Sequence, residues 1–330
     1  MSLPRSILYL TEAEVQQTLT VAEAVDLAEQ GIRADAAGQV VGDKFYMNVG
    51  QAGFIKPFSG YLAGEELAFV KTFSFFPANP ARFDCSTTSS MVLLFDAGTG
   101  LPVCLMEAAW ITALKTGAST AVTAAHLARP GADTALIFGA GMLGKMHLRA
   151  LSHRFSLRRA YVVDLLPHVA ESYAAELGRE LDLPVEPIPL EARRQAVGEA
   201  DLVITVTTGD QALVERAWLR PGAFVARLGS YQEVALDVIA GADKVIVDNW
   251  HYVRPRIPEL AMLAEAGRFG PENVHAAWPD VVAGRRPGRE SEQEIIVYLA
   301  LGIWGEYAAI LPQVYRRARS LGLGQELART

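Results

Sequence analysis

The sequence predicts an α/β protein that combines a Rossmann doubly wound parallel sheet with a β-rich N-terminal domain for substrate binding and dimerisation. Two observations predict it. In the middle of the chain an apolar run, residues 135–138, leads into the sequence Gly-Ala-Gly-Met-Leu-Gly at residues 139–144 and then into a segment that suits a helix. This is the order of a dinucleotide-binding turn. After the turn, short apolar runs alternate with helical segments, whereas strands dominate before it. A C-terminal helix is expected to complete the N-terminal domain.

The glycine turn predicts where a dinucleotide binds. Its first glycine permits a sharp turn, its second lets backbone N–H groups approach a pyrophosphate, and its third lets the next helix pack closely on the strand. The N-terminus of that helix carries partial positive charge for the phosphates. The following strand, residues 159–163, ends at an acid about 20 residues beyond the turn, the spacing of a ribose-binding carboxylate. An ordinary α/β turn with incidental glycines is the alternative. The predicted cofactor-binding residues of this region are Gly139, Gly141, Met142, Leu143, Gly144 and Asp164.

The composition bounds the class of protein. Of the 330 residues, 51% are hydrophobic and 20% are charged, which is typical of a globular protein with room for about two domains. We expect a substrate-binding and dimerisation domain at residues 1–115, a Rossmann domain at 116–290, and a helical return onto the first domain at 291–330. The net charge of −7 and the lack of a block rich in Lys and Arg argue against a nucleic-acid partner.

Cysteine and histidine usage excludes several kinds of site. The two cysteines, Cys85 and Cys104, are isolated and predict neither a disulfide framework nor a zinc cluster. The histidines are also isolated, so no metal site is expected. The N-terminal segment is unlike a signal peptide, and no apolar run reaches membrane-spanning length. We therefore expect a cytoplasmic protein without a membrane partner.

Before the glycine turn, helices are followed by strands and then by a linking helix. Thr-x-x-Glu capping boxes begin helices at Thr11 and Thr20. Strands are predicted at residues 45–49, 68–76, 91–95 and 103–106, and a helix at residues 108–127.

One face of the linking helix is polar. Its side chains are spaced i, i+3, i+4 and i+7, so they share that face. The face is either a solvent-exposed stripe or the wall of a cleft at the domain junction. Its members are Thr112, Lys115, Thr116 and Ser119; we expect Thr116 to bind the cofactor.

After the second Rossmann strand the chain alternates as a doubly wound sheet does. Strands are predicted at residues 201–207, 223–228 and 244–248, and helices at 167–181, 190–197, 236–240 and 257–267. Thr207 and Gly229 stand at carboxyl ends of strands, where ligands bind in open parallel sheets, so we expect both to contact the cofactor. Beyond Arg289 the pattern is helical, at residues 294–311 and 314–321.

Four stretches in this order resemble the ornithine cyclodeaminase/mu-crystallin family over nearly the whole length of the chain. They are Val-Lys-Thr at residues 70–72 with Pro-Ala-Asn-Pro at 77–80, Leu-Phe-Asp-Ala-Gly-Thr-Gly-Leu-Pro at 94–102, Ile-Thr-Ala-Leu-Lys-Thr-Gly-Ala at 111–118, and the glycine turn at 137–144. The C-terminal half is most similar to the dehydrogenases of siderophore and 2,3-diaminopropionate biosynthesis.

The resemblance implies a homodimeric NAD(P)-dependent enzyme that moves a hydride between the α-carbon of an amino acid and the nicotinamide, through an imine. We expect an amino acid dehydrogenase or imine reductase with a small amino or imino acid as substrate. A cyclodeaminase with bound NAD, in which a side-chain amine attacks the imine and the hydride returns, is the alternative enzyme. A non-catalytic ligand-binding protein like mu-crystallin is the alternative outside enzymes, although Lys71 and the intact glycine turn argue against it.

The resemblance also implies roles for single residues. Lys71 matches the family's active-site lysine; a strand lysine is otherwise exposed to solvent. Lys115 and Lys44 stand where the family has arginines that bind the substrate carboxylate, and lysine lacks the two-pronged pairing of arginine. Ser230 stands where cyclodeaminases and alanine dehydrogenases have an aspartate. Glu233 is either a substitute for that aspartate or a solvent-exposed acid of the loop.

Three further expectations follow. Lys44, Lys71 and Lys115 should converge on one cleft beside the nicotinamide, where mutual repulsion lowers the pKa of at least one of them. Asp164 should accept both ribose hydroxyls and repel a 2′-phosphate, so NAD is favoured over NADP. The apolar residues of the predicted helix at 294–311 leave more surface than one subunit covers, which favours a homodimer.

Overall fold

The computed structural model describes residues 6–328 and divides into two compact units. The first unit comprises Met1–Lys115 and Ile303–Thr330, and the second comprises Thr116–Gly302. The chain thus begins the first unit, builds the second, and returns to complete the first.

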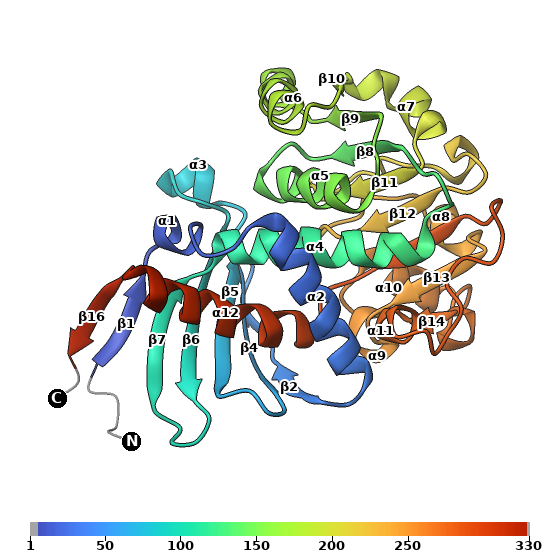
Figure 1. The fold of residues 1–330 in the computed structure, drawn as a ribbon. Coiled ribbons are helices and arrows are strands. Elements are labelled where there is room, and N and C mark those ends of the chain that lie inside the picture. Colours follow the sequence, from blue (N-terminus) through green and yellow to red (C-terminus); the bar gives the residue numbers. More distant parts are fainter. Residues whose placement is uncertain (1–5, 329–330) are drawn as a thin grey trace. The chain divides into compact units, whose positions relative to one another are not determined.

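An eight-stranded mixed sheet forms the framework of the first unit. Its strands are β1 (Ser6–Leu10), β2 (Val40–Lys44), β3 (Met47–Val49), β4 (Gly53–Leu62), β5 (Leu67–Phe75), β6 (Thr88–Asp96), β7 (Pro102–Glu107) and β16 (Gln325–Ala328). They are ordered β16-β1-β7-β6-β5-β4-β2, with β3 paired to β4 (Figure 1). Only the β1–β7 pair is parallel among these described strands.

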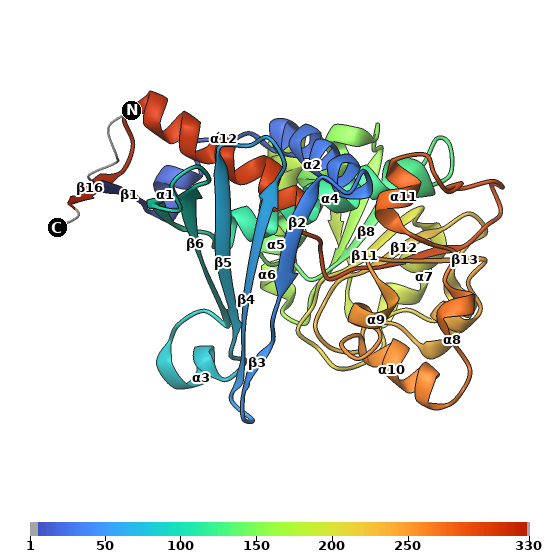
Figure 2. The ribbon, with the colours of Figure 1, turned by 90° about the horizontal axis from the view of Figure 1, so that it is seen from below.

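The helices of the first unit are α1 (Glu12–Val15), α2 (Val21–Ala36), α3 (Asn79–Phe83), α12 (Gly305–Leu321) and the beginning of α4 (Ala109–Leu127). Helices α1, α2 and α12 pack on one another or on this sheet, and the short α3 lies in the connection from β5 to β6. Both predicted capping boxes are present, at Thr11 and Thr20. Figure 1 and Figure 2 both show α2 and α12 side by side. A Cβ added to Gly31 would lie 2.1 Å from the carbonyl oxygen of Gly305, so only glycine permits this close packing. The C-terminal helix is thereby placed against β4 and β5.

The second unit contains a parallel sheet of eight strands. Its strands are β8 (Thr134–Phe138), β9 (Arg159–Val163), β10 (Val185–Pro187), β11 (Leu202–Thr205), β12 (Phe224–Arg227), β13 (Lys244–Val247), β14 (Ala276–Ala277) and β15 (Ile296–Leu299). Their order is β10-β9-β8-β11-β12-β15-β13-β14, and every pairing is parallel. All residues of β8, β11, β12, β13 and β15 are buried, as in parallel sheets covered on both faces.

Helical segments connect these strands. They are the rest of α4, α5 (Met142–Arg154), α6 (Pro167–Leu181), η1 (Leu190–Ala192), α7 (Arg193–Glu199), η2 (Arg216–Trp218), α8 (Leu236–Ala240), α9 (Trp250–Val253), α10 (Pro258–Glu265), η3 (Pro271–Asn273) and α11 (Trp278–Val282). The predicted α/β class, with a Rossmann parallel sheet and a β-rich N-terminal part, is confirmed. Within residues 6–328, no helix is both long and apolar enough to cross a membrane.

The predicted helical return at residues 291–330 and its first helix, at 294–311, begin too early. Residues Ile296–Leu299 form β15, which inserts between β12 and β13, and the second unit therefore extends to Gly302 rather than to residue 290. Helix α12 begins only at Gly305. A short apolar run fits a buried strand as well as a buried helix. The residues of β15 are all buried within the single chain, so they give no support to a dimer interface.

Two strands of the first unit also differ from expectation. The predicted strand at residues 45–49 is interrupted, since β2 ends at Lys44 and β3 begins at Met47. Strand β4 was not predicted, because Gly53, Pro57 and Gly60 are residues that usually interrupt strands. The predicted strands at residues 68–76, 91–95 and 103–106 correspond to β5, β6 and β7.

Candidate active site

Lys71 lies inside the first unit, surrounded by aromatic rings. Alternation along β5 points its side chain to the face that α12 covers, and its exposed fraction is 1%. Its Nζ is 5.1 Å from the ring centroid of Phe58, 5.2 Å from that of Tyr307 and 5.4 Å from that of Phe73. A solvent-exposed strand lysine, the alternative considered above, is therefore excluded.

The surroundings of Lys71 favour its neutral form. Burial lowers the pKa of Lys71 well below its ordinary value, and the nearby charges of Lys56 and Lys115 lower it further. Aromatic faces attract a cation but do not replace its hydration. The side chain is thus suited to give up its proton more readily than an exposed lysine and to take it back during a reaction.

Lys115 forms a buried ion pair with a residue of the C-terminal helix. Its Nζ is 3.0 Å from Oε2 of Glu306, and the side chains are 6% and 1% exposed. The same carboxylate oxygen accepts a hydrogen bond from the backbone N–H of Ile303. Nζ of Lys115 also lies 4.9 Å from the ring centroid of Tyr307. Lys115 and Lys71 therefore share the Tyr307 ring, but the charge of Lys115 is already offset by Glu306.

The polar face of α4 is not a solvent-exposed stripe. Lys115 is 5% exposed and Ser119 is 3% exposed, while Thr112 and Thr116 are half-buried. The hydroxyl of Thr112 donates to the carbonyl oxygen of Ala108. The solvent-facing alternative is wrong for this helix.

Lys44 occupies the same sheet face as Lys71, two strands away. In register, Lys44 is opposite Phe58 and Phe58 is opposite Lys71, and directly opposite residues project to the same side of a sheet. Nζ of Lys44 lies 5.2 Å from the ring of Trp304. The structure therefore brings Lys71 and Lys115 together at one ring and leaves Lys44 on the far side of Phe58.

Lys56 was missed by the sequence analysis. It lies on β4 opposite Phe73, and its Nζ is 5.2 Å from the Phe73 ring, 5.5 Å from the Tyr46 ring and 6.0 Å from the Phe58 ring. Residues 54, 56 and 58 alternate along β4 and share one face of the sheet, which would have indicated Lys56. This pattern was not used because β4 was not predicted as a strand. Glu306 and Tyr307 were also missed, since nothing local connects them to Lys71 or Lys115.

The glycine turn has the geometry of a dinucleotide-binding turn. Gly139 has φ +102°, which favours glycine, and a Cβ on Gly144 would lie 1.9 Å from the carbonyl oxygen of Gly139. Gly141 is the N-cap of α5, and a Cβ added there meets no atom within 4 Å. Open space thus lies in front of the helix N-terminus, with Met142 exposed and Leu143 half-buried beside it. A pyrophosphate fits this position.

Asp164 directly follows β9 and is hydrogen-bonded to the backbone of the glycine turn. Its Oδ2 accepts a hydrogen bond from the backbone N–H of Ala140 at 2.9 Å, and its Oδ1 accepts one from Leu166 at 3.0 Å. Each carboxylate oxygen has capacity for a second donor. The side chain is half-buried, so it is positioned to bind hydroxyl groups.

The Glu233 side chain is hydrogen-bonded to residues at the carboxyl ends of β11 and β12. Its Oε1 accepts hydrogen bonds from the N–H of Thr207 at 2.5 Å and from the Thr207 hydroxyl at 2.9 Å. Its Oε2 accepts them from the Thr205 hydroxyl at 2.8 Å and from the N–H of Gly229 at 2.7 Å. Burial raises the pKa of Glu233, against the opposing effects of Arg227 and these hydrogen bonds.

A second buried carboxylate supports the same loop. Oε1 of Glu259 accepts from the backbone N–H of Glu233 at 2.9 Å, and Arg227 pairs with Glu259 while both are fully buried. Arg227 also donates to the carbonyl oxygens of Gly229 and Tyr231. The loop after β12 is therefore held by charged groups on its inner side.

Glu233 does not take the place of the missing aspartate. It is 0% exposed, and both of its oxygens accept hydrogen bonds from its own unit. Ser230 is exposed on the same loop, so its hydroxyl is accessible to a ligand but carries no charge. The suggestion that Glu233 substitutes for the aspartate is wrong.

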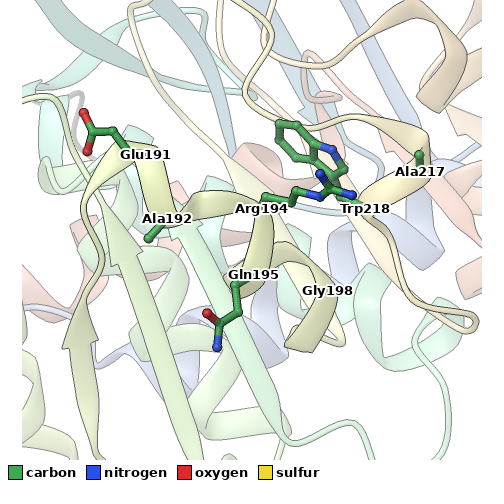
Figure 3. A pocket seen from close by; sticks show the side chains of 7 residues that line it. All are labelled: Glu191, Ala192, Arg194, Gln195, Gly198, Ala217 and Trp218. Atoms are coloured by element: carbon green, nitrogen blue, oxygen red, sulfur yellow. The ribbon is translucent and has the colours of Figure 1, made fainter.

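A shallow pocket lies elsewhere on the second unit (Figure 3). The labelled side chains of Arg194, Gln195 and Trp218 are among those that line it. The pocket contains none of the predicted site residues. Its lining consists of Glu191, Ala192, Arg194, Gln195, Gly198, Ala217 and Trp218.

No group of acidic, histidine and cysteine side chains within residues 6–328 is arranged to hold a metal ion. Cys85 and Cys104 are both free. Two groups of residues are therefore suited to chemistry. The first is the lysine cluster of the first unit, formed by Lys56, Lys71 and Lys115. The second is the glycine turn of the second unit at residues 139–144.

These two sites define a class: dinucleotide-binding α/β proteins with a buried amine in a separate β-rich unit. Within that class, comparison with known families identifies the group. The model of the ornithine cyclodeaminase/mu-crystallin family matches residues 6–322, and the chain belongs to this family. The resemblance proposed from the sequence is confirmed.

Three relatives illustrate the range of the family. N-((2S)-2-amino-2-carboxyethyl)-L-glutamate dehydrogenase of Staphylococcus aureus is 30% identical over 250 residues, which cover 76% of this chain and 74% of the relative. The structure of Thermococcus litoralis Delta(1)-pyrroline-2-carboxylate reductase with NADH and L-proline has a TM-score of 0.92 at 26% identity and covers 97% of this chain and 99% of its own. An archaeal alanine dehydrogenase dimer with bound NAD has a TM-score of 0.90 at 25% identity, with coverages of 98% and 100%.

Proposed function

We propose that the protein is an NAD-dependent oxidoreductase that acts on the C–N bond of an amino acid or its imine. The family and the relatives described above, two dehydrogenases and an imine reductase, support this activity. The observation that carries the proposal is Lys71, an amine buried among three aromatic rings whose pKa is lowered by burial and by neighbouring lysines. A non-catalytic binding protein has no use for such a group.

The residues of the second unit fit NAD. The turn formed by Gly139, Gly141 and Gly144, with Met142 and Leu143, would hold the pyrophosphate at the start of α5. Asp164 would bind the ribose hydroxyls and repel a 2′-phosphate, so NAD is preferred to NADP. When bound, the nicotinamide accepts a hydride from the substrate carbon or returns it.

Residues beyond the ends of β11 and β12 complete the proposed nucleotide site. Thr207 and Gly229 lie just past these strands, where Glu233 accepts a hydrogen bond from the backbone N–H of each. We assign both to the cofactor because ligands bind outside the carboxyl ends of strands in such sheets. Thr116, which is half-buried within α4, is assigned to the cofactor from the family resemblance of its flanking residues.

Lys71 would move the proton of the reaction. In the oxidative direction its neutral Nζ takes a proton from the substrate ammonium group. The freed lone pair of the substrate nitrogen forms the C=N bond as the α-hydrogen leaves as a hydride. In the reductive direction the protonated Lys71 returns the proton to the amine.

The substrate carboxylate would be bound by cations of the same sheet face. Lys44 is assigned to this role, and the exposed Ser230 to a neutral hydrogen bond. Lys115 contributes less than the family's arginine would, because Glu306 offsets its charge at 3.0 Å. The acid is thus held by single-point contacts rather than by a two-pronged pair.

Assembly and location complete the proposal. A homodimer is supported by the archaeal alanine dehydrogenase dimer, and light scattering would measure it for this chain. The two free cysteines suit a reducing compartment such as the cytoplasm.

The test is a substrate screen in both directions. The purified protein is supplied with NAD and single amino acids, or with NADH and pairs of keto acid and amine, while nicotinamide absorbance and ammonia release are followed. Net reduction of NAD that depends on an amino acid supports the proposal. Ammonia released from ornithine or lysine without net NADH would identify a cyclodeaminase, and NADH binding without any turnover would identify a binding protein.

A further inference from the structure

Lysines on two neighbouring strands share the same two aromatic rings. Nζ of Lys56 and Nζ of Lys71 each lie within 6.0 Å of the ring centroids of Phe58 and Phe73. The register explains this arrangement, because Lys56 is opposite Phe73 and Phe58 is opposite Lys71. Alternation keeps all four side chains on one face of the sheet. The two amines therefore lie on one face of the sheet, beside the same pair of rings.

The two amines differ in their contact with solvent. Lys71 is 1% exposed, whereas Lys56 is half-buried and has a third ring, that of Tyr46, at 5.5 Å. Rings beside an ammonium group stabilise its charge and orient it, and ammonium groups bind carboxylates through charge-assisted hydrogen bonds. Lys56 therefore has the properties of a ligand-binding cation, and Lys71 those of a proton carrier.

The neighbouring cations have different partners. Lys115 is held by the Glu306 carboxylate, and Nζ of Lys44 lies over Trp304 rather than over the two shared rings. Lys56 is thus the cation that accompanies Lys71 at the shared rings Phe58 and Phe73.

We propose that Lys56 binds a second acidic group of the substrate, so that the protein acts on an amino or imino acid with two acidic groups. This inference rests on the proposed function, because it takes Lys71 to mark the reacting nitrogen. The α-carboxylate would be bound elsewhere on the sheet face, and the distal acid would reach the ammonium group of Lys56.

The experiment compares acids with their amides. Calorimetric titration of the NADH-loaded protein with L-aspartate, L-asparagine, L-glutamate and L-glutamine separates the second charge from shape, because each acid and amide pair is nearly isosteric. In at least one pair the acid should bind about 10-fold to 100-fold more tightly, the range of a charge-assisted hydrogen bond.

Variants assign this preference to Lys56. Lys56→Met should reduce the affinity for the preferred acid about 10-fold or more and leave the amide within about 2-fold. Methionine packs well among aromatic rings, so this variant should fold. Lys56→Arg should retain the preference. Arg317→Met, which removes an exposed charge paired with Glu23 in the same unit, is the control and should change neither affinity.

The outcomes separate this inference from the proposed function. Equal affinities for acid and amide in the unmodified protein, or an equal loss of both in Lys56→Met, would overturn the second-acid site. Turnover of neutral amino acids without a preference for acids would leave the proposed function standing while rejecting the inference. Tight, Lys56-dependent binding of an acid without reduction of NAD would support the inference about the site and reject the oxidoreductase activity.

Discussion

Lys71 in the first unit and Glu233 in the second are both titratable groups with almost no exposed surface, at 1% and 0%. Burial shifts both toward the neutral form, since it lowers the pKa of Lys71 and raises that of Glu233. The side chains differ in the groups that surround them. Four donors point at the Glu233 carboxylate, whereas rings and like charges surround the amine of Lys71.

The difference teaches that burial alone does not mark a reactive group. Complementary donors make Glu233 a fixed element of the loops after β11 and β12, and its hydrogen bonds leave it little capacity for a substrate. Lys71 is held by packing, so its nitrogen can exchange a proton. Variants of each region should therefore fail in different ways, through loss of chemistry in one and loss of structure in the other.

The largest effect is expected at Lys71. Lys71→Met should lower kcat about 100-fold to 10,000-fold, the usual contribution of a positioned acid or base, because it removes the proton carrier while filling the same apolar space. NADH affinity, measured by fluorescence titration, should stay unchanged. Near-normal turnover in this variant would contradict both the role of Lys71 and the mechanism.

The Lys115–Glu306 pair tests whether a cation of the same cluster is structural. Lys115→Met should lower the free energy of unfolding by about 3–5 kcal/mol, since it leaves a buried carboxylate without its cation. Adding Glu306→Gln should restore much of that loss, which chemical denaturation of the single and double variants would measure. If Lys115→Met keeps its stability and only raises KM, Lys115 is a substrate ligand instead.

Glu233→Gln sharpens the contrast with Lys71. Each carboxylate oxygen accepts a hydrogen bond from a backbone N–H, from Thr207 or from Gly229. The NH2 group of glutamine would therefore face one of these backbone donors, which cannot reorient. We expect a loss of about 1–3 kcal/mol in the free energy of unfolding, together with weaker binding of NADH. Thr205→Val removes one hydroxyl donor and keeps the carboxylate, so it should cost less. Unchanged NADH affinity in Glu233→Gln would separate these loops from the cofactor.

The pH dependence is the subtlest test. The neutral form of Lys71 accepts the proton, so kcat/KM for oxidation should rise with pH through the lowered pKa and level off well below the ordinary lysine value of 10.5. Lys56→Met removes a positive neighbour, so it should raise the pKa of Lys71 and move this rise to higher pH. A profile that is identical in both proteins would show that Lys56 does not influence Lys71.

The second unit was largely predictable from the sequence. Its strands are continuous apolar runs, and the glycine turn has a spacing that few other structures require, so β8, β9, β11, β12 and β13 were located. β15 was not, because its short apolar run, residues 295–303, has no periodicity that separates strand from helix.

The lysine cluster was only partly predictable. Lys71 was found through the resemblance of its flanking residues, but its lowered pKa depends on burial among side chains contributed by β4, β5 and α12 and on the charges of Lys56 and Lys115. Glu306 is 191 positions from Lys115 along the chain, and no local pattern connects them. Lys56 was missed because β4 was not predicted. The glycines and the proline of β4 argue against a strand, but pairing with β2 on one side and β5 on the other stabilises it.

The return of the chain to its first unit has a consequence for biosynthesis. Glu306 and Tyr307, which contact Lys115 and Lys71, are translated only after the whole of the second unit, Thr116–Gly302. Domains generally fold as units during synthesis, the N-terminal one first. Here the first unit cannot be completed first, because α12 and β16 are synthesised after every residue of the second unit. The side of Lys71 that Tyr307 covers therefore lacks this ring until synthesis is nearly finished.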